Sequence, residues 1–179
     1  MMAELLGRPA STAETASDAL RPVFASMLTG RSLGEGVLPA TLGLVPADFD
    51  ALWEHYFPGP RLRLDNGRGE NIPELSDIHD LLLEYRASEQ VPVTWMAQIV
   101  AYGCAGRDHL WQDLGLANRD ELSLLMETAF PTLAELNVGD MKWKKFIYRH
   151  YCSREGIYVC PAPSCGECAD YSKCFSPEE

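Results

Sequence analysis

The stretch DMKWKKFIYRHYCSRE, residues 140–155, has the apolar periodicity of a long amphipathic helix. At 100° per residue, one face of this helix collects four large side chains: Trp143, Phe146, Ile147 and Tyr151. A separate basic row has the spacing i, i+3, i+7 and holds Lys142, Lys145 and Arg149. Gly156 follows directly and is a typical C-terminal helix stop. The stretch therefore predicts a helix that buries its aromatic face and closes a helical core.

The same periodicity recurs along most of the chain before this helix. The segments with a helical apolar stripe are 15–29, 47–57, one from Pro73, one from Pro92 to Gly103, one from Asn118 and a short one from Pro131. The sequence therefore predicts an all-α fold, with a single helical domain over 13–155 after a flexible N-terminal arm over 1–12. Residues 156–179 are predicted to form a cysteine-rich, cluster-binding tail packed on that domain.

The net charge of −11 argues against a general nucleic-acid binder, but the charge is unevenly distributed. Residues 141–155 carry five Lys or Arg against Glu155 alone, a local +4, so the remainder carries −15. This basic island either compensates an anionic cluster, recruits an anion, or is simply a solvated helix face. No apolar stretch approaches the length of a membrane span, and no secretory leader is expected. We therefore expect a cytoplasmic protein whose cysteines meet a reducing environment and favour metal ligation over disulfides.

Four of the six cysteines lie close together near the C-terminus and follow the spacing C-x4-C-x2-C-x5-C. They are Cys160, Cys165, Cys168 and Cys174. Structural zinc sites usually pair two C-x2-C knuckles, whereas this tail has one C-x2-C with a flanking cysteine on each side. That arrangement favours an iron–sulfur cluster of the 4Fe–4S or 3Fe–4S type, with zinc and disulfides as the alternatives.

Three residues outside this motif are further candidate ligands. Cys152 comes eight residues before Cys160, on the helix that leads into the tail. Cys104 and His109 lie five residues apart in a glycine-flanked segment. A buried cysteine is often only a small apolar residue, and a lone histidine is often structural. If all three are ligands, they should converge on the tail sulfurs within a distance on the order of 10 Å, since metal–thiolate bonds are about 2.3 Å long.

Two segments resemble a known family. The run MKWKKFIYRHYCSREGIYVCPAPSCGECADYSKCFSPEE (141–179) is similar to the C-terminal signature of the NifQ family of nitrogen-fixation proteins. The run CAGRDHLWQDLGLANRDELSLLMETAFPTLAELN (104–137) resembles an upstream stretch of the same family. Ser176 departs from the glycine that is common at its position.

The resemblance implies an iron–sulfur protein that carries molybdenum and donates it for assembly of the nitrogenase iron–molybdenum cofactor. The implied partners are the cofactor scaffold complex, the nitrogenase iron protein, and molybdate or thiomolybdate as the incoming anion. The chain is then a metal-trafficking protein and not an enzyme, with no membrane or nucleic-acid partner. The alternative is an iron–sulfur or zinc protein that binds nucleic acid through the basic helix 141–155. A small electron carrier is a weaker alternative, because it would not need a large helical domain.

Overall fold

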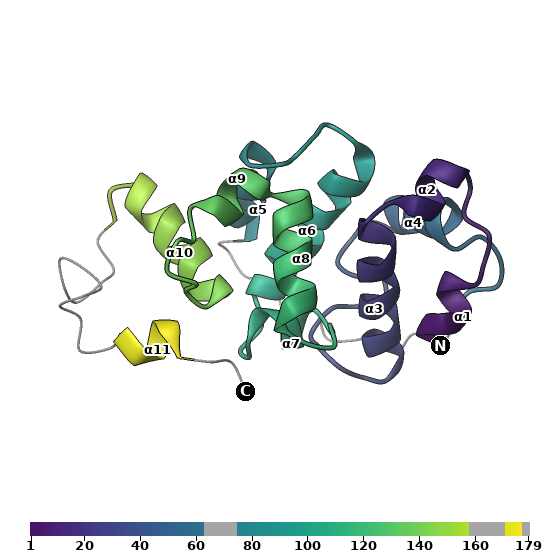
Figure 1. Cartoon of the computed structure of the whole chain (residues 1–179), viewed down its shortest axis with the longest axis horizontal. Coiled ribbons are helices and arrows are strands. Elements are labelled where there is room, and N and C mark those ends of the chain that lie inside the picture. Colours follow the sequence, from purple (N-terminus) through teal and green to yellow (C-terminus); the bar gives the residue numbers. More distant parts are fainter. Residues whose placement is uncertain (63–74, 158–170, 177–179) are drawn as a thin grey trace.

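The structure is a computed structural model, and it describes residues 1–62, 75–157 and 171–176. The described residues form helices and no strand, which confirms the all-α prediction (Figure 1). In chain order the helices are α1 (Met2–Leu6), α2 (Ala13–Ser17), α3 (Leu20–Ser32), α4 (Pro46–Tyr56), α5 (Leu75–Glu84), α6 (Val91–Cys104), α7 (Leu110–Asp113), α8 (Arg119–Ala129), α9 (Pro131–Glu135), α10 (Trp143–Arg154) and α11 (Tyr171–Phe175). No helix among them is long and apolar enough to cross a membrane.

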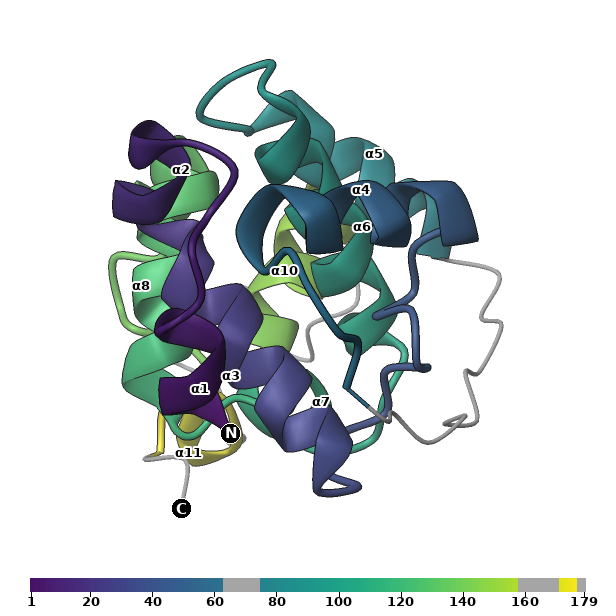
Figure 2. The ribbon, with the colours of Figure 1, turned by 90° about the vertical axis from the view of Figure 1, so that its right-hand side faces the viewer.

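Helix α6, like α3, is buried over most of its length. Its buried side chains cover most of its circumference and include Trp95, Met96, Ile99 and Val100, whereas Thr94 is exposed on the remaining side. A helix that is apolar over most of its circumference must be covered by several neighbours. Helices α5, α7 and α8 pack against α6, and α3 packs against α8. Helices α10 and α11 lie at one end of the long axis, and α1 to α4 at the other (Figures 1 and 2).

The N-terminus differs from the flexible arm predicted over residues 1–12. Residues 2–6 form α1, which packs on α3, and the Leu5 side chain is fully buried. Met2, Leu5 and Leu6 repeat at helical spacing, but the repeat spans too few residues to stand out in the sequence. Burial of Leu5 stabilises this short helix, which would be marginal in isolation.

The predicted helix over 15–29 is divided in two by Asp18. Helix α2 ends there, and the Asp18 carboxylate accepts a hydrogen bond from the Leu20 N–H at 2.9 Å, at the start of α3. An aspartate side chain competes well for backbone N–H groups at the start of a helix, and here it interrupts the helical hydrogen bonding. The apolar periodicity nevertheless continues from α2 into α3, which is why the sequence predicted one helix.

The helix start that the sequence predicted at Asn118 is confirmed, with Asn118 as the N-cap of α8. The Asn118 side chain accepts a hydrogen bond from the Glu121 N–H at 3.0 Å. The Glu121 carboxylate does not accept from the Asn118 N–H, as it would in a capping box. It accepts from the Ala117 N–H at 3.0 Å and from the Ser26 hydroxyl at 2.6 Å. Glu121 therefore ties α8 to α3 as well as supporting the helix start.

Helix α10 begins later than the sequence predicted, at Trp143. Its aromatic face is buried through Trp143, Phe146 and Ile147, as expected, whereas Tyr151 is only half-buried. The basic side of the helix faces away from the core. This leaves residues 137–142 as a turn between α9 and α10, and that turn positions the end of the chain.

Candidate functional site

Three of the four predicted cluster ligands, Cys160, Cys165 and Cys168, lie outside the described residues. The fourth, Cys174, lies on α11 and is half-buried. Its carbonyl oxygen accepts a hydrogen bond from the Lys142 N–H at 2.8 Å, just before α10. The next side chain, Phe175, packs on Gly139, where an added Cβ would come within 2.9 Å of the ring. The cysteine-bearing helix is thus docked on the turn over 137–142.

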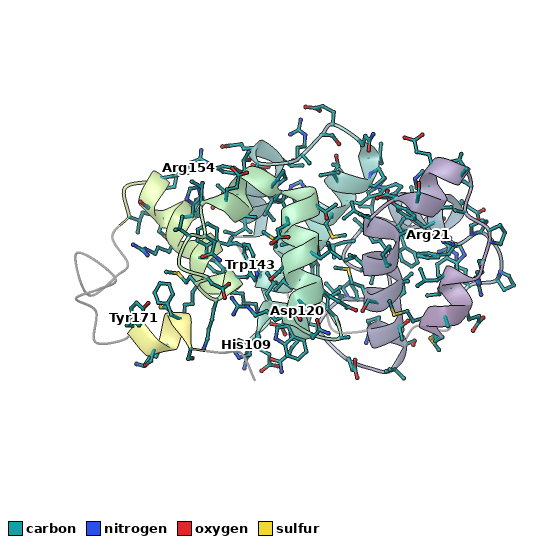
Figure 3. All side chains as sticks on the ribbon, in the orientation of Figure 1. Arg21, His109, Asp120, Trp143, Arg154 and Tyr171 are labelled. Carbon is teal, nitrogen blue, oxygen red and sulfur yellow. The ribbon has the colours of Figure 1, made fainter. Side chains whose placement is uncertain are left out.

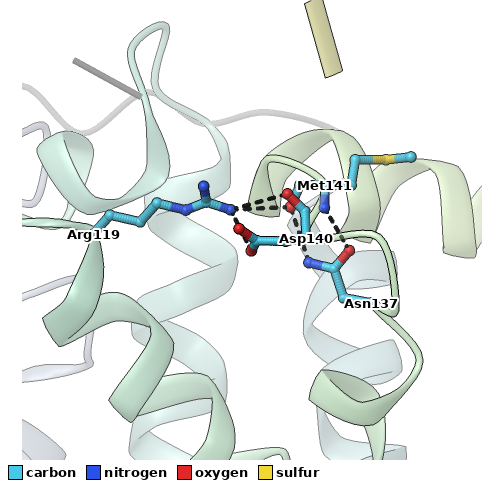
Figure 4. Close-up of polar contacts among 4 residues, drawn as sticks. All are labelled: Arg119, Asn137, Asp140 and Met141. Atoms are coloured by element: carbon cyan, nitrogen blue, oxygen red, sulfur yellow. Dashed lines mark hydrogen bonds and ion pairs between the residues drawn. The ribbon is translucent and has the colours of Figure 1, made fainter. Parts of the chain in front are cut away.

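That turn is fixed by polar contacts on both sides (Figure 4). The Asn137 side chain accepts from the Met141 N–H and donates to the Met141 carbonyl, both at 2.9 Å. Asp140 has a positive φ of 50°, a conformation that Asn and Asp adopt more readily than other non-glycine residues. Arg119 of α8 bonds the Asp140 carboxylate at 2.8 Å and also reaches the two carbonyls of Asp140 and Met141. The turn is therefore held to the domain by α8 before it holds α11.

A pocket of about 640 Å³ opens beside the docked helix. Its lining comes from three segments: residues 107–112, the first turns of α10, and α11. The lining residues are Arg107, Asp108, His109, Leu110, Gln112, Lys142, Lys144, Lys145, Tyr148 and Lys173. Figure 3 shows His109 on the side of the domain that faces α11, where Tyr171 is labelled. The pocket thus places the predicted residues His109, Lys142 and Lys145 together.

His109 is positioned by the start of α7. It is the N-cap residue of this helix, and its backbone N–H donates to the Gln112 side-chain oxygen at 3.1 Å. This hydrogen bond fixes the backbone from which the imidazole projects into the pocket wall. His109 and Lys173, the neighbour of Cys174, line the same pocket.

The wall behind the pocket contains a buried ion pair. Asp113, at the end of α7, is 1% exposed and pairs with Lys144 of α10. Burial raises the pKa of the Asp113 carboxyl, and Lys144 partly opposes that rise. The Asp108 N–H also donates to Asp113 at 3.1 Å, and a Cβ at Gly106 would overlap the carboxylate. This pair holds the 106–113 segment against α10.

Cys104 lies behind the same wall and not in the pocket. Its side chain is buried at 4% exposure, and its carbonyl accepts a hydrogen bond from the Tyr148 hydroxyl at 3.2 Å. Burial raises the pKa of the Cys104 thiol to about 12, so the group is a neutral thiol near pH 7. These features favour a packing role for Cys104, because a metal ligand must be a thiolate.

Cys152 and Arg149 lie elsewhere on α10. Cys152 is near the C-terminal end of the helix, where its carbonyl accepts from the Ile157 N–H at 2.8 Å. Ten residues separate it from Lys142, the residue that bonds Cys174, which corresponds to about 15 Å along a helix axis. Arg149 is exposed and does not line the pocket, so the predicted basic row is divided. The predicted convergence of Cys152, Cys104 and His109 on the tail cluster is untested, since the other tail cysteines are not described, and the burial of Cys104 argues against that residue as one of the ligands.

Sequence reasoning missed three cations of this pocket: Arg107, Lys144 and Lys173. Arg107 and Lys173 are close in sequence to the candidate ligands His109 and Cys174. This proximity could have identified them as residues of the same site. Lys144 is on the opposite side of α10 from the row by sequence pattern, and its pairing with Asp113 depends on tertiary packing. Within the described ranges, no group of three or more His, Cys, Asp or Glu side chains could hold a metal ion by itself.

Comparison with known proteins covers nearly the whole chain. The sequence profile of the NifQ family matches residues 23–176. The NifQ protein of Rhodobacter capsulatus is 39% identical to this chain, over 90% of the chain and 91% of the relative. The NifQ proteins of Azotobacter vinelandii and Klebsiella pneumoniae are 38% and 37% identical, over 81% and 79% of this chain. The alignments cover 82% and 90% of those two relatives. No solved structure matches the chain significantly. Because the family profile matches residues 23–176 and these relatives are 37–39% identical over most of the chain, the chain belongs to the NifQ family.

Proposed function

We propose that this protein, a member of a nitrogen-fixation family, is a metal-trafficking protein and not an enzyme. In this proposal Cys160, Cys165, Cys168 and Cys174 hold an iron–sulfur cluster. Molybdenum is carried in or beside that cluster and is donated for assembly of the nitrogenase iron–molybdenum cofactor.

The observation that carries the proposal is the four-cysteine motif, whose last member is anchored to the helical domain. Cysteine thiolates are the usual ligands of iron–sulfur clusters, and sulfur-rich surroundings suit molybdenum held through bridging sulfide. Cys174 is half-buried, and it is placed by a backbone hydrogen bond from Lys142 and by the packing of Phe175. A thiol at such a position is accessible to a cluster while its backbone stays fixed, which fits a ligand.

His109 is our preferred non-thiol partner for molybdenum. A neutral imidazole is a borderline ligand, and it exchanges more readily than a bridging thiolate. Its place in a pocket that Lys173 also lines supports this assignment. Cys152, half-exposed near the C-terminal end of α10, is the remaining accessible thiol among the described residues that could assist.

The proposed recipients are the scaffold complex on which the cofactor matures and the nitrogenase iron protein. We place the protein in the cytoplasm, where a reducing environment keeps the thiols available for a cluster.

A transfer assay tests this function. Protein purified without oxygen and loaded with molybdenum is mixed with the scaffold complex, the iron protein and cofactor-deficient nitrogenase. We expect nitrogenase activity without added molybdate, and no activity from a Cys168→Ala protein treated in the same way. Equal activity from both proteins would show that the cysteine tail is not the source of the metal.

A further inference from the structure

We propose that a second pocket, between α8, α9 and the turn over 137–142, is the docking face for the protein that receives the metal. The partner enters this pocket with a segment that carries an arginine or lysine side chain. This inference rests on the proposed function, since it places the recipient on the carrier. It involves none of the four predicted cluster ligands and no described lining residue of the pocket beside α11.

The charge of this pocket, whose volume is about 420 Å³, is the first argument. Its described lining contains no Lys, Arg or His and consists of Ser123, Glu127, Pro131, Ala134, Glu135, Asn137, Asp140 and Trp143. Arg119 pairs with Asp140, whereas no cation pairs with Glu127 or Glu135 in the described part of the chain. Both glutamates are exposed. Two unpaired carboxylates at one pocket favour a partner with a cationic side chain.

Trp143 is the second argument, and it is independent of charge. Its side chain lines the pocket and is only 4% exposed. Its indole N–H is buried and has no hydrogen-bond acceptor among the described residues. A buried donor without a partner costs free energy, and most such groups are paired in folded proteins. A backbone carbonyl of a segment that enters the pocket would supply the acceptor, so the indole favours a peptide chain over a bare cation.

The apolar surroundings of the pocket are the third argument. Leu136 and Val138 are exposed, and they flank Asn137, which lines the pocket. Leu124 is also exposed and is next to Ser123, another lining residue. Protein docking sites often combine a polar anchor with apolar contacts that exclude water from it. These side chains fit a protein partner and give a small cation nothing to bind.

The position of the pocket suits the transfer of a metal from the tail. Asn137 and Asp140 line the pocket, and their side chains also fix the turn over 137–142 (Figure 4). The Lys142 N–H, at the end of this turn, bonds the Cys174 carbonyl. A partner seated in the pocket therefore lies against the turn that docks the Cys174 helix. This brings the recipient next to the end of the chain that carries the predicted ligands.

Binding of the proposed recipients to the full chain, purified without oxygen, is the direct test. The scaffold complex and the nitrogenase iron protein are each titrated by biolayer interferometry, and we expect at least one of them to bind. The double variant Glu127→Gln/Glu135→Gln and the single variant Leu136→Ser should each lower that affinity at least about tenfold. The effect of the double variant should shrink at higher ionic strength, because salt screens the wild-type attraction.

Matched controls lie at the other end of the long axis, on or next to α3 and α4 (Figure 1). Asp48→Asn/Glu54→Gln removes the same charge from two exposed residues of α4, and Leu33→Ser removes an exposed leucine after α3. Each control should change the affinity less than about twofold, since the sites are distant and independent.

Hydrogen exchange locates the contact on the same samples. The bound recipient should slow amide exchange over residues 134–142, which include the turn, and leave exchange in α4 unchanged. Protection of α4 with none over 134–142 would contradict the assignment.

Three further results would overturn the inference: neither recipient binds the wild type, the pocket variants bind as tightly as the wild type, or the α4 control weakens binding equally. A wild-type dimer in sedimentation that Glu127→Gln/Glu135→Gln dissociates would identify a second copy of the chain as the occupant instead. Metal content separates these failures from failure of the proposed function. A double variant that holds iron and delivers molybdenum as well as the wild type contradicts the docking face alone, whereas a wild type without iron contradicts the proposed function.

Discussion

Two thiols near the pocket differ because of their surroundings. Cys104 is buried among apolar residues, and the pKa of its thiol is raised to about 12. Cys174 is half-buried on a short surface helix. A thiol becomes a ligand or a nucleophile only as the thiolate, so the burial of Cys104 disfavours both roles for that residue.

Alkylation measures this difference directly. In the iron-free protein at pH 8, iodoacetamide should modify Cys174 and Cys152 readily and Cys104 only after unfolding in urea. The reason is that roughly one in 10⁴ thiols with a pKa near 12 is ionised at pH 8. Peptide mass spectrometry identifies each site. Reaction of Cys104 at the rate of Cys152 in the folded protein would contradict its burial.

For the ion pair between Asp113 and Lys144, removing one partner is expected to lower the free energy of unfolding more than removing both. Lys144→Met leaves an almost fully buried carboxylate unpaired, which should lower the free energy of unfolding by about 3 kcal/mol. The double variant Asp113→Asn/Lys144→Met should recover most of this loss in urea titrations. Arg154→Met, which breaks the exposed pair with Glu84, is the control and should shift the urea midpoint far less.

The same variant has a defined pH dependence. The pKa of Asp113 is raised by burial, so the folded state binds a proton more readily than the unfolded chain. Stability from this carboxyl is therefore greatest at low pH and is lost as the pH rises through the raised pKa. Removing Lys144 raises that pKa further. The deficit of Lys144→Met should thus shrink between pH 8 and pH 5, and a deficit that grows toward pH 5 would contradict the assignment.

Among the elements, α11 is docked with the help of a close contact and a hydrogen bond in the described part of the chain. Phe175 fits over Gly139, and the Lys142 N–H bonds the Cys174 carbonyl. Gly139 does not have a left-handed backbone, so a side chain at this position would cause no backbone strain. Its effect would come from the contact with Phe175.

Gly139→Ala should displace α11 from the turn. The added methyl meets the Phe175 ring at 2.9 Å, and overpacking of this kind costs about 1–3 kcal/mol. Alkylation of Cys174 should become faster, while the melting temperature of the domain changes little. Val138→Ala is the control, because Val138 is 92% exposed and next in sequence. Identical Cys174 reactivity in the two variants would mean that Phe175 does not anchor the helix.

The elements that the sequence predicted well are those with strong local signals. Asn118 and the prolines at 46, 92 and 131 mark helix starts that the structure has within one residue. The break at Asp18 and the short helix α1 depend on a competing side-chain bond and on tertiary burial, which apolar periodicity does not report.

For the site, periodicity placed Lys142 and Lys145 on one row. Periodicity could not show that Arg149 lies outside the pocket. Nor could it show that Arg107 and Lys173 line the pocket, because these two residues come from other segments of the chain.

In the molecule as a whole, the described residues of the tail add little to the helical core. The buried apolar cluster runs from Leu5 to Ile147, and from residues 171–176 it is joined only by partly buried Cys174 and Phe175. Metal ligation should therefore contribute little to the stability of the domain.

Removal of the metal tests this separation of core and tail. Chelation of iron should leave the far-ultraviolet circular dichroism nearly unchanged, because the long helices lie in the domain. The melting temperature should fall by a few degrees at most, on the order of 1 kcal/mol of stability. Loss of most of the helical signal would instead mean that the cluster is part of the folding core, as it is in small zinc domains.

We propose above that the four tail cysteines hold an iron–sulfur cluster associated with molybdenum. The most direct measurement is the iron, sulfide and molybdenum content per chain of protein purified without oxygen, for the wild type and for alanine variants of Cys160, Cys165, Cys168 and Cys174, with Cys104→Ala as the control. We predict iron, sulfide and molybdenum in the wild type and in Cys104→Ala, and loss of iron and molybdenum in each tail variant. Unchanged iron and sulfide in all four tail variants, or zinc in place of iron in the wild type, would contradict the claim.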